Sequence, residues 1–169
     1  DFPEWSDRGD GPGAPVAVHL PNSPVIQTGK RDGSKIRLPN GNYLEETASY
    51  YVLVETKAGG MTPALISMKS TQLNVSKKWN SMMKTIQIPD GKGGMAIPPM
   101  HGVVYNLQSV LQKNDKGSWY GWSVTQDRIM GQEDKSLYLT AKDFNSTAAK
   151  GNVQTKADVE EKAKDSTPY

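Results

Sequence analysis

The sequence predicts a mainly β protein of the α+β class, arranged as an OB-like five-stranded barrel. A helix is expected between strands 3 and 4, and a second helix at the C-terminal end. Three observations lead to this prediction. Segments rich in β-branched and aromatic residues alternate with turn signals, two segments repeat apolar residues at helical spacing, and the element order matches the OB arrangement. An unrelated α+β fold with the same element order is the alternative.

The N-terminal stretch, residues 1–46, is rich in Gly, Pro, Asn and charge, which predicts long loops around one or two edge strands. Val16–Val18 is the expected first strand, and Pro21 ends it. Asn40–Asn42 is a turn signal between two further short apolar segments.

The strongest strand patterns follow in the segment 47–151. Residues 49–55 and 64–68 flank a glycine turn and read as one hairpin, while 103–107 and 119–124 flank the turn 114–117 and read as another. We expect 47–151 to be the OB-like core, 152–169 a charged polar tail, and the whole chain one domain.

Two helices are predicted from the spacing of their apolar residues. The first begins at Ser70 or Thr71, and the second ends at Gly151 as its C-cap residue. The apolar residues of the first are Leu73, Val75, Trp79, Met82, Met83 and Ile86, and those of the second are Leu137, Ala141, Phe144 and Ala148.

Composition excludes several classes of site. The 169-residue chain has no cysteine, so disulfides, thiolate metal sites and thiol catalysis are excluded. No apolar segment approaches the roughly 20 residues of a membrane-spanning helix, and no signal peptide is apparent. Because the chain opens at Asp1, we expect it to be a fragment of a longer protein. The net charge of +2 conceals a basic centre, +6 over residues 27–125, which suits a polyanion partner but also lies within ordinary surface scatter.

No motif indicates an enzyme, a metal site or a cofactor. His19 and His101 each lack a second ligand at metal spacing and read as surface residues, and the glycine-rich segment 90–94 lacks phosphate-loop spacing. An enzyme whose carboxylates converge from distant positions is the least favoured alternative.

The last hairpin combines the two features that sequence-independent binding of a nucleic acid single strand requires, cations for phosphates and aromatic faces for bases. Lys113 and Lys116 flank its turn, Trp119, Tyr120 and Trp122 lie on its second strand, and Tyr105 lies on its first. Alternation places Tyr120 and Trp122 on the face of Val124, which predicts that they point inward and that Trp119 points outward. The competing interpretation is that all of these aromatic residues belong to the core.

The earlier hairpin extends this set. Tyr51 shares a face with Glu55, so we expect Tyr51 rather than Tyr50 to point outward. Further candidate cations for a binding groove are Lys57, Lys69 and Arg37, together with Arg31 and Lys35.

Several of these segments resemble a family of tailed-bacteriophage proteins. The resemblance covers residues 43–150 and is most distinctive at Asn114-Asp115-Lys116-Gly117-Ser118-Trp119-Tyr120-Gly121-Trp122, with further similarity at 62–73, 77–83 and 98–100. Members of the family are described as single-stranded DNA-binding proteins of the phage replication module or are left uncharacterised. The resemblance implies single-stranded DNA and phage replication proteins as partners, and the host cytoplasm as location.

We therefore expect a non-catalytic single-stranded DNA-binding protein of a bacteriophage, without cofactor or membrane contact, that acts in replication or recombination. The alternative is a virion-structural or transcription-accessory protein-interaction module, which an exposed apolar patch would favour. The sequence leaves the oligomeric state open.

Overall fold

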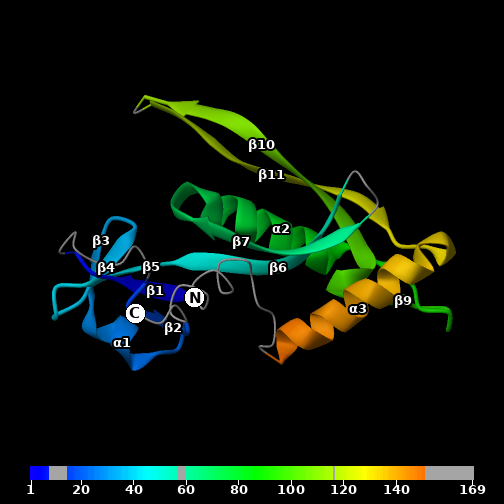
Figure 1. Cartoon of the computed structure of the whole chain (residues 1–169), viewed down its shortest axis with the longest axis horizontal. Coiled ribbons are helices and arrows are strands. Elements are labelled where there is room, and N and C mark those ends of the chain that lie inside the picture. Colours follow the sequence, from blue (N-terminus) through cyan, green and yellow to red (C-terminus); the bar gives the residue numbers. More distant parts are fainter. Residues whose placement is uncertain (8–14, 57–59, 116, 151–169) are drawn as a thin grey trace, which may run out of the picture. The chain divides into compact units, whose positions relative to one another are not determined.

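The computed structural model describes residues 1–7, 15–56, 60–115 and 117–150, shown in Figure 1. Its strands are β1 (Phe2–Trp5), β2 (Ala17–His19), β3 (Lys30–Asp32), β4 (Lys35–Arg37), β5 (Tyr43–Glu45), β6 (Thr47–Glu55), β7 (Met61–Lys69), β8 (Ile88–Pro89), β9 (Met95–Ala96), β10 (Val103–Asn114) and β11 (Gly117–Ile129). Its α-helices are α1 (Pro24–Thr28), α2 (Leu73–Thr85) and α3 (Lys135–Ala149), and three short 3-10 helices are η1 (Ser70–Gln72), η2 (Met100–Gly102) and η3 (Gln132–Asp134).

The chain forms two compact units. Unit 1 comprises residues 1–49 and 67–78, and unit 2 comprises residues 50–66 and the chain from Trp79 onward. The chain passes between the units three times, and each passage lies inside a regular element, namely β6, β7 or α2.

Unit 1 is organised by a five-stranded antiparallel sheet of order β2-β1-β5-β4-β3. Its small core consists of Ile36, Leu38 and Leu44, against which Phe2 and residues of α1 pack. The sequence predicts only one or two edge strands here, and that prediction is wrong, because segments of three or four residues pair with distant segments to make a complete sheet. The predicted strand at Val16–Val18 is observed one residue later, as β2, and the turn at residues 40–42 joins β4 to β5.

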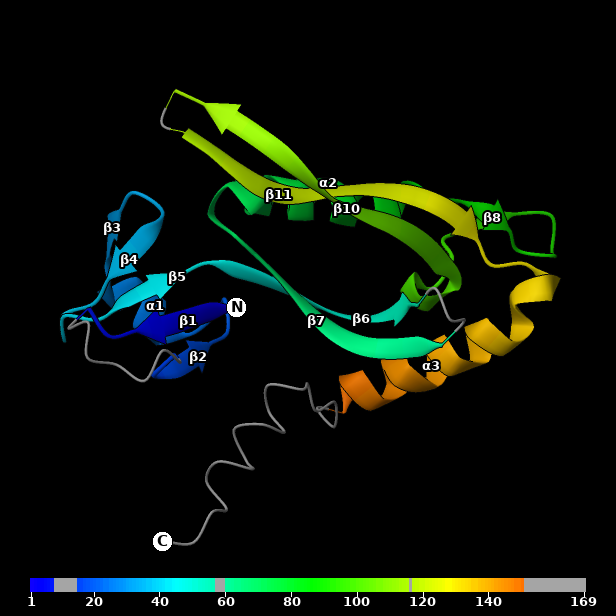
Figure 2. The ribbon, with the colours of Figure 1, turned by 45° about the horizontal axis from the view of Figure 1, so that its top comes forward.

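Unit 2 is built around two long antiparallel elements and two helices. Strands β10 and β11 pair over their whole length, from Val103 opposite Ile129 to Asn114 opposite Gly117. Figure 2 shows them as a ribbon that is separate from the one formed by β6 and β7. The two hairpins and two helices predicted for this part of the sequence are present in the predicted order, but the structure adds the short β8–β9 hairpin between α2 and β10. The expected C-cap at Gly151 and the tail 152–169 fall outside the described residues.

The mainly β, α+β class is confirmed, but the five-stranded barrel is wrong. The described strands fall into one five-stranded sheet and three two-stranded ones, and no sheet among them closes on itself. The element order matched because order along the chain does not determine which strands pair. The N-terminal strands pair with each other, so they are not available to close a barrel with β10 and β11.

Candidate functional site

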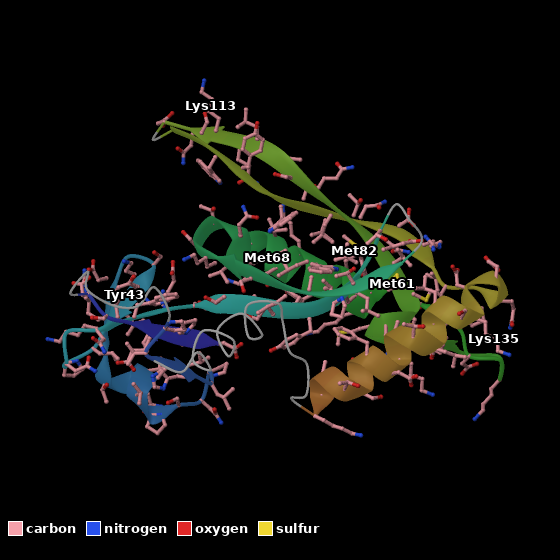
Figure 3. All side chains as sticks on the ribbon, viewed as in Figure 1. Tyr43, Met61, Met68, Met82, Lys113 and Lys135 are labelled. Carbon is pink, nitrogen blue, oxygen red and sulfur yellow. The ribbon has the colours of Figure 1, made fainter. Side chains whose placement is uncertain are left out.

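The β10–β11 ribbon exposes a set of aromatic and apolar side chains near its turn. Tyr120 is 72% exposed, Leu111, its partner across the ribbon, is 62% exposed, and Trp122 is 37% exposed. Lys113 is exposed two residues beyond Leu111 and is labelled at the end of the ribbon in Figure 3. Because directly opposed residues and alternate residues share a face of a two-stranded sheet, these four side chains lie on one surface, which we call the arm face.

The ribbon that carries the arm face is longer than the helix that its base contacts. The 13 residues of β11 span about 43 Å at ~3.3 Å per residue. The 13 residues of α2, the helix that the base of the ribbon contacts, span only about 20 Å. In Figure 1 the turn end of the ribbon projects away from the other elements of unit 2, and in this part of the ribbon the arm face is the more exposed of the two faces.

The base of the ribbon is the packed end of the same face. The ring of Tyr105 meets Trp79 of α2 edge-on at 5.6 Å between centroids, and Trp79 meets Tyr50 of β6 at 4.5 Å. The indole of Trp79 is 3% exposed, and burial raises the pKa of Tyr105 above its ordinary value. Tyr105 pairs with Gln126 and belongs to this aromatic core, so it lies away from the exposed residues with which the sequence grouped it.

Trp119 lies on the opposite face of the ribbon from the arm face. It is half-buried, its indole nitrogen is buried, and Gly121 two residues later is buried. The sequence predicts Trp119 outward and Tyr120 and Trp122 inward, and the structure reverses this prediction. The prediction that Tyr120 and Trp122 share a face with Val124 is correct. The core under that face ends before Trp122, so both aromatic side chains are exposed.

The predicted cations are divided between the units and differ in how they are engaged. Lys113 belongs to the arm face, whereas Lys116 and Lys57 lie outside the described residues. Lys69 in unit 1 forms an ion pair with Glu45, with 3.1 Å between Nζ and Oε2.

Arg37, also in unit 1, bonds to Asp7 at 2.5 Å and to Asp32 at 3.3 Å, and these carboxylates raise its pKa. Lys35 lies over the ring of Tyr43 at 3.7 Å from the centroid. The sequence groups Lys69 and Arg37 with the aromatic residues as candidate contacts for phosphates. In the structure both cations already interact with carboxylates.

Tyr51 on β6 is 50% exposed, which confirms the prediction that it points outward. Its neighbour Tyr50 points to the core, where its hydroxyl is 3.1 Å from Oδ1 of Asn80. The β6–β7 hairpin thus offers one further exposed aromatic side chain in unit 2.

Sequence reasoning missed a buried polar network in unit 1. Glu4 is 7% exposed, its Oε1 accepts hydrogen bonds from Asn42 at 2.6 Å and Asn40 at 3.0 Å, and its Oε2 is 2.8 Å from Nε2 of His19. The bonds from Asn42 and His19 lower the pKa of Glu4, although burial opposes them. His19 is therefore not the free surface residue that the sequence predicts. The turn signal at Asn40 and Asn42 was visible in the sequence, but its acceptor 36 residues away was not.

His101 is also less exposed than predicted. Its ring packs at a tilt against that of Tyr138 of α3, with 5.2 Å between the ring centroids, and burial together with Lys142 lowers its pKa. Among the described residues, no group of three or more His, Cys, Asp or Glu side chains is placed to hold a metal ion. None of the described helices is long and apolar enough to cross a membrane.

Comparison with known proteins finds a family whose model matches most of the chain. The model of a protein family described as Pam3 phage gp34-like protein matches residues 1–154, which includes all of unit 1, unit 2 as far as residue 154, and therefore the whole β10–β11 ribbon. No curated protein matches the chain, and no solved structure matches it.

Proposed function

Since the chain belongs to the Pam3 phage gp34-like family, we propose that it is a non-catalytic single-stranded DNA-binding protein of a bacteriophage. Membership confirms the phage affiliation that the sequence predicted, and DNA binding is the step added here. One observation carries the proposal: Tyr120 and Trp122 are exposed, alternate residues of one strand, on the arm face. In this proposal the protein acts in replication or recombination in the host cytoplasm, without a metal or cofactor.

Base stacking supplies the affinity in this mechanism. Side chains two residues apart on a strand are roughly 6.6–6.8 Å apart along it, about twice the separation of stacked rings, so two bases can insert beside Tyr120 and Trp122. Stacking of a base on an aromatic side chain is worth ~1–3 kcal/mol and tolerates any base. The binding is accordingly independent of sequence and requires unpaired bases.

Phosphate contacts are few in this mechanism. Lys113 is the cation of the arm face among the described residues, and the sequence adds Lys116 three residues further along the chain. Each phosphate neutralised on a single strand contributes a slope of about −0.7 to the dependence of log affinity on log salt. We therefore expect a slope of about −1.4 per protein chain for these two lysines, well below that of a protein with a broad basic groove.

The experiment is a titration of tryptophan fluorescence with oligo-dT at low and at high salt, with duplex DNA of equal charge as the comparison. Saturable quenching by oligo-dT alone is expected. Tyr120→Ala and Trp122→Ala should each weaken binding about 5- to 100-fold, and Leu139→Ala, at an exposed apolar residue of α3, is the matched control. Undiminished binding by the Tyr120→Ala/Trp122→Ala double variant would contradict the proposal.

A protein-interaction module is the second candidate, and Leu111 favours it. This aliphatic side chain is 62% exposed in the middle of the arm face, where it suits an apolar protein surface better than a base. Tyr120→Phe and Leu111→Ala separate the two candidates. A stacking site tolerates Tyr120→Phe and loses little with Leu111→Ala, whereas a packed protein interface loses substantially with Leu111→Ala.

A further inference from the structure

We propose that protonation of His101 releases helix α3 from the short helix η2, so that the docking of α3 within unit 2 depends on pH. This dependence goes beyond the proposed function and does not require that the protein bind DNA.

Helix α3 is docked chiefly on η2. Of the described elements, η2 is the one that α3 contacts most. Gly102 of η2 is buried, and a methyl group added to it would lie 3.5 Å from Cε2 of Tyr138, which is van der Waals contact. Ala141, about one turn further along α3, is buried as well. A change in the η2 surface therefore acts on the principal contact of the helix.

His101 lies in this contact. Its ring centroid is 5.2 Å from that of Tyr138, and the two rings are tilted by 54°. Its Nε2 atom is shielded from solvent and has no hydrogen-bond partner among the described residues. A neutral imidazole carries one N–H group, whereas a protonated one carries N–H on both ring nitrogens. Protonation would therefore place a charged donor without an acceptor inside the packed surface, which costs more than burial of the neutral ring.

The charge that faces His101 from α3 also opposes its protonation. Lys142 lies about one turn after Tyr138 on this helix, and its charge acts on His101. In η3, which precedes α3, Asp134 is already engaged, because its carboxylate is 3.2 Å from Arg128. Burial, and then Lys142, lower the pKa of His101, and no carboxylate of the described residues offsets them.

The sign of the effect follows from this lowered pKa. Once α3 has left, His101 faces water and titrates near its ordinary pKa of 6.5, so the undocked state takes up the proton first as pH falls. Docking is therefore strongest above about pH 6.5 and weakens as the pH falls toward the docked pKa. This window lies above that of Glu4, whose ordinary pKa is 4.5 and is lowered in the folded chain.

The test is hydrogen exchange of the α3 amides in the full chain, measured by mass spectrometry between about pH 7.5 and pH 5.5. The reference is His101→Phe, whose ring can pack against Tyr138 but takes up no proton. Comparing the two chains at the same pH cancels the intrinsic pH dependence of exchange. We expect the ratio of wild-type to variant exchange rate to rise at least about threefold over this range, and at most about tenfold per pH unit, because one proton is taken up.

Reversal of the neighbouring charge separates protonation of His101 from a general effect of acid. Lys142→Glu places a carboxylate where it favours the imidazolium, so acid should no longer release α3 in this variant. Lys142 is exposed, so the substitution does not disturb the packing of the helix. Lys150→Glu makes the same change of charge about 12 Å further along the chain, at the end of α3, and should keep the wild-type response.

Equal exchange of the α3 amides in the wild type and His101→Phe at every pH would overturn the inference, and so would an undiminished acid response in Lys142→Glu. If His101→Phe fails to dock α3 at pH 7.5, the comparison of Lys142→Glu with Lys150→Glu decides alone. The oligo-dT titration is read separately at pH 7.5. Binding of oligo-dT with pH-independent docking contradicts only this inference, and pH-dependent docking without binding contradicts only the proposed function.

Discussion

The sheet of unit 1 and the β10–β11 ribbon of unit 2 differ in the length of their strands and in the charge of their side chains. The sheet is short-stranded and polar, and its charged groups are matched within it: Glu4 by His19 and two asparagines, Arg37 by Asp7 and Asp32. The ribbon is long and uncharged over most of its length, and it exposes Tyr120 and Leu111. The comparison shows that the basic residues in a sequence do not by themselves locate a binding surface, because Arg37 and Lys69 of unit 1 already have carboxylate partners.

The largest expected effect comes from removing the buried carboxylate of the sheet. Glu4→Ala leaves two asparagine amides and His19 without their acceptor, which should cost about 2–4 kcal/mol of unfolding free energy. Glu4→Gln should cost clearly less, because its amide oxygen can still accept from both asparagines. Chemical denaturation measures both, and equal losses for the two variants would show that the network is not what stabilises the sheet.

The next largest effect separates the two faces of the ribbon. Trp119→Ala should lower the unfolding free energy by ~1–3 kcal/mol because its ring is half-buried, whereas Tyr120→Ala should change it by less than about 0.5 kcal/mol. Thermal denaturation of the two variants, each compared with the wild type, measures these two losses of stability. A larger loss for Tyr120→Ala would mean that the arm face is covered in the folded chain.

Acid should weaken the sheet through Glu4. Its pKa in the folded chain lies below the ordinary value of 4.5, so the unfolded chain takes up the proton first as pH falls. The stabilisation is therefore complete above about pH 4.5 and is lost as pH falls toward the folded pKa. The difference in melting temperature between the wild type and Glu4→Gln should shrink between pH 6 and pH 3, and a difference that stays constant would contradict the assignment.

The smallest effect is expected from the paired cations. Arg37→Ala and Lys69→Ala should each change oligo-dT affinity less than about twofold, because these side chains already form ion pairs. Lys113→Ala should reduce the affinity more and lower the salt slope by about 0.7. A loss with Arg37→Ala larger than that with Lys113→Ala would place unit 1 in the binding surface.

Local pattern was sufficient to predict the long elements of residues 47–149, although not the two-residue strands β8 and β9. Strong β-composition, a glycine turn and helical spacing are each contained in a few consecutive residues, so β6, β7, α2, β10, β11 and α3 were all anticipated. The sheet of unit 1 was not, because strands such as Lys30–Asp32 are wholly exposed and carry no apolar pattern. Such strands are held by their partners, which lie elsewhere in the sequence.

The site was predicted in part for the same reason. Alternation along β11 correctly separated Trp119 from Tyr120 and Trp122, since it depends only on neighbours in the chain. Deciding which set faces water required knowing which face of the ribbon is packed in its turn-side half, and alternation alone does not show that. The acceptor of Asn40 and Asn42 was hidden because Glu4 lies far away along the chain.

The three passages of the chain between the units have a practical meaning for anyone who shortens the gene. A reading frame stopped after Ser49 would encode most of unit 1 but lack residues 67–78, which complete it. A frame begun at Tyr50 would encode all of unit 2 yet carry those same residues without the sheet they belong with. Neither unit can be cloned alone as one uninterrupted piece, so variants of either must be made and assayed in the whole polypeptide.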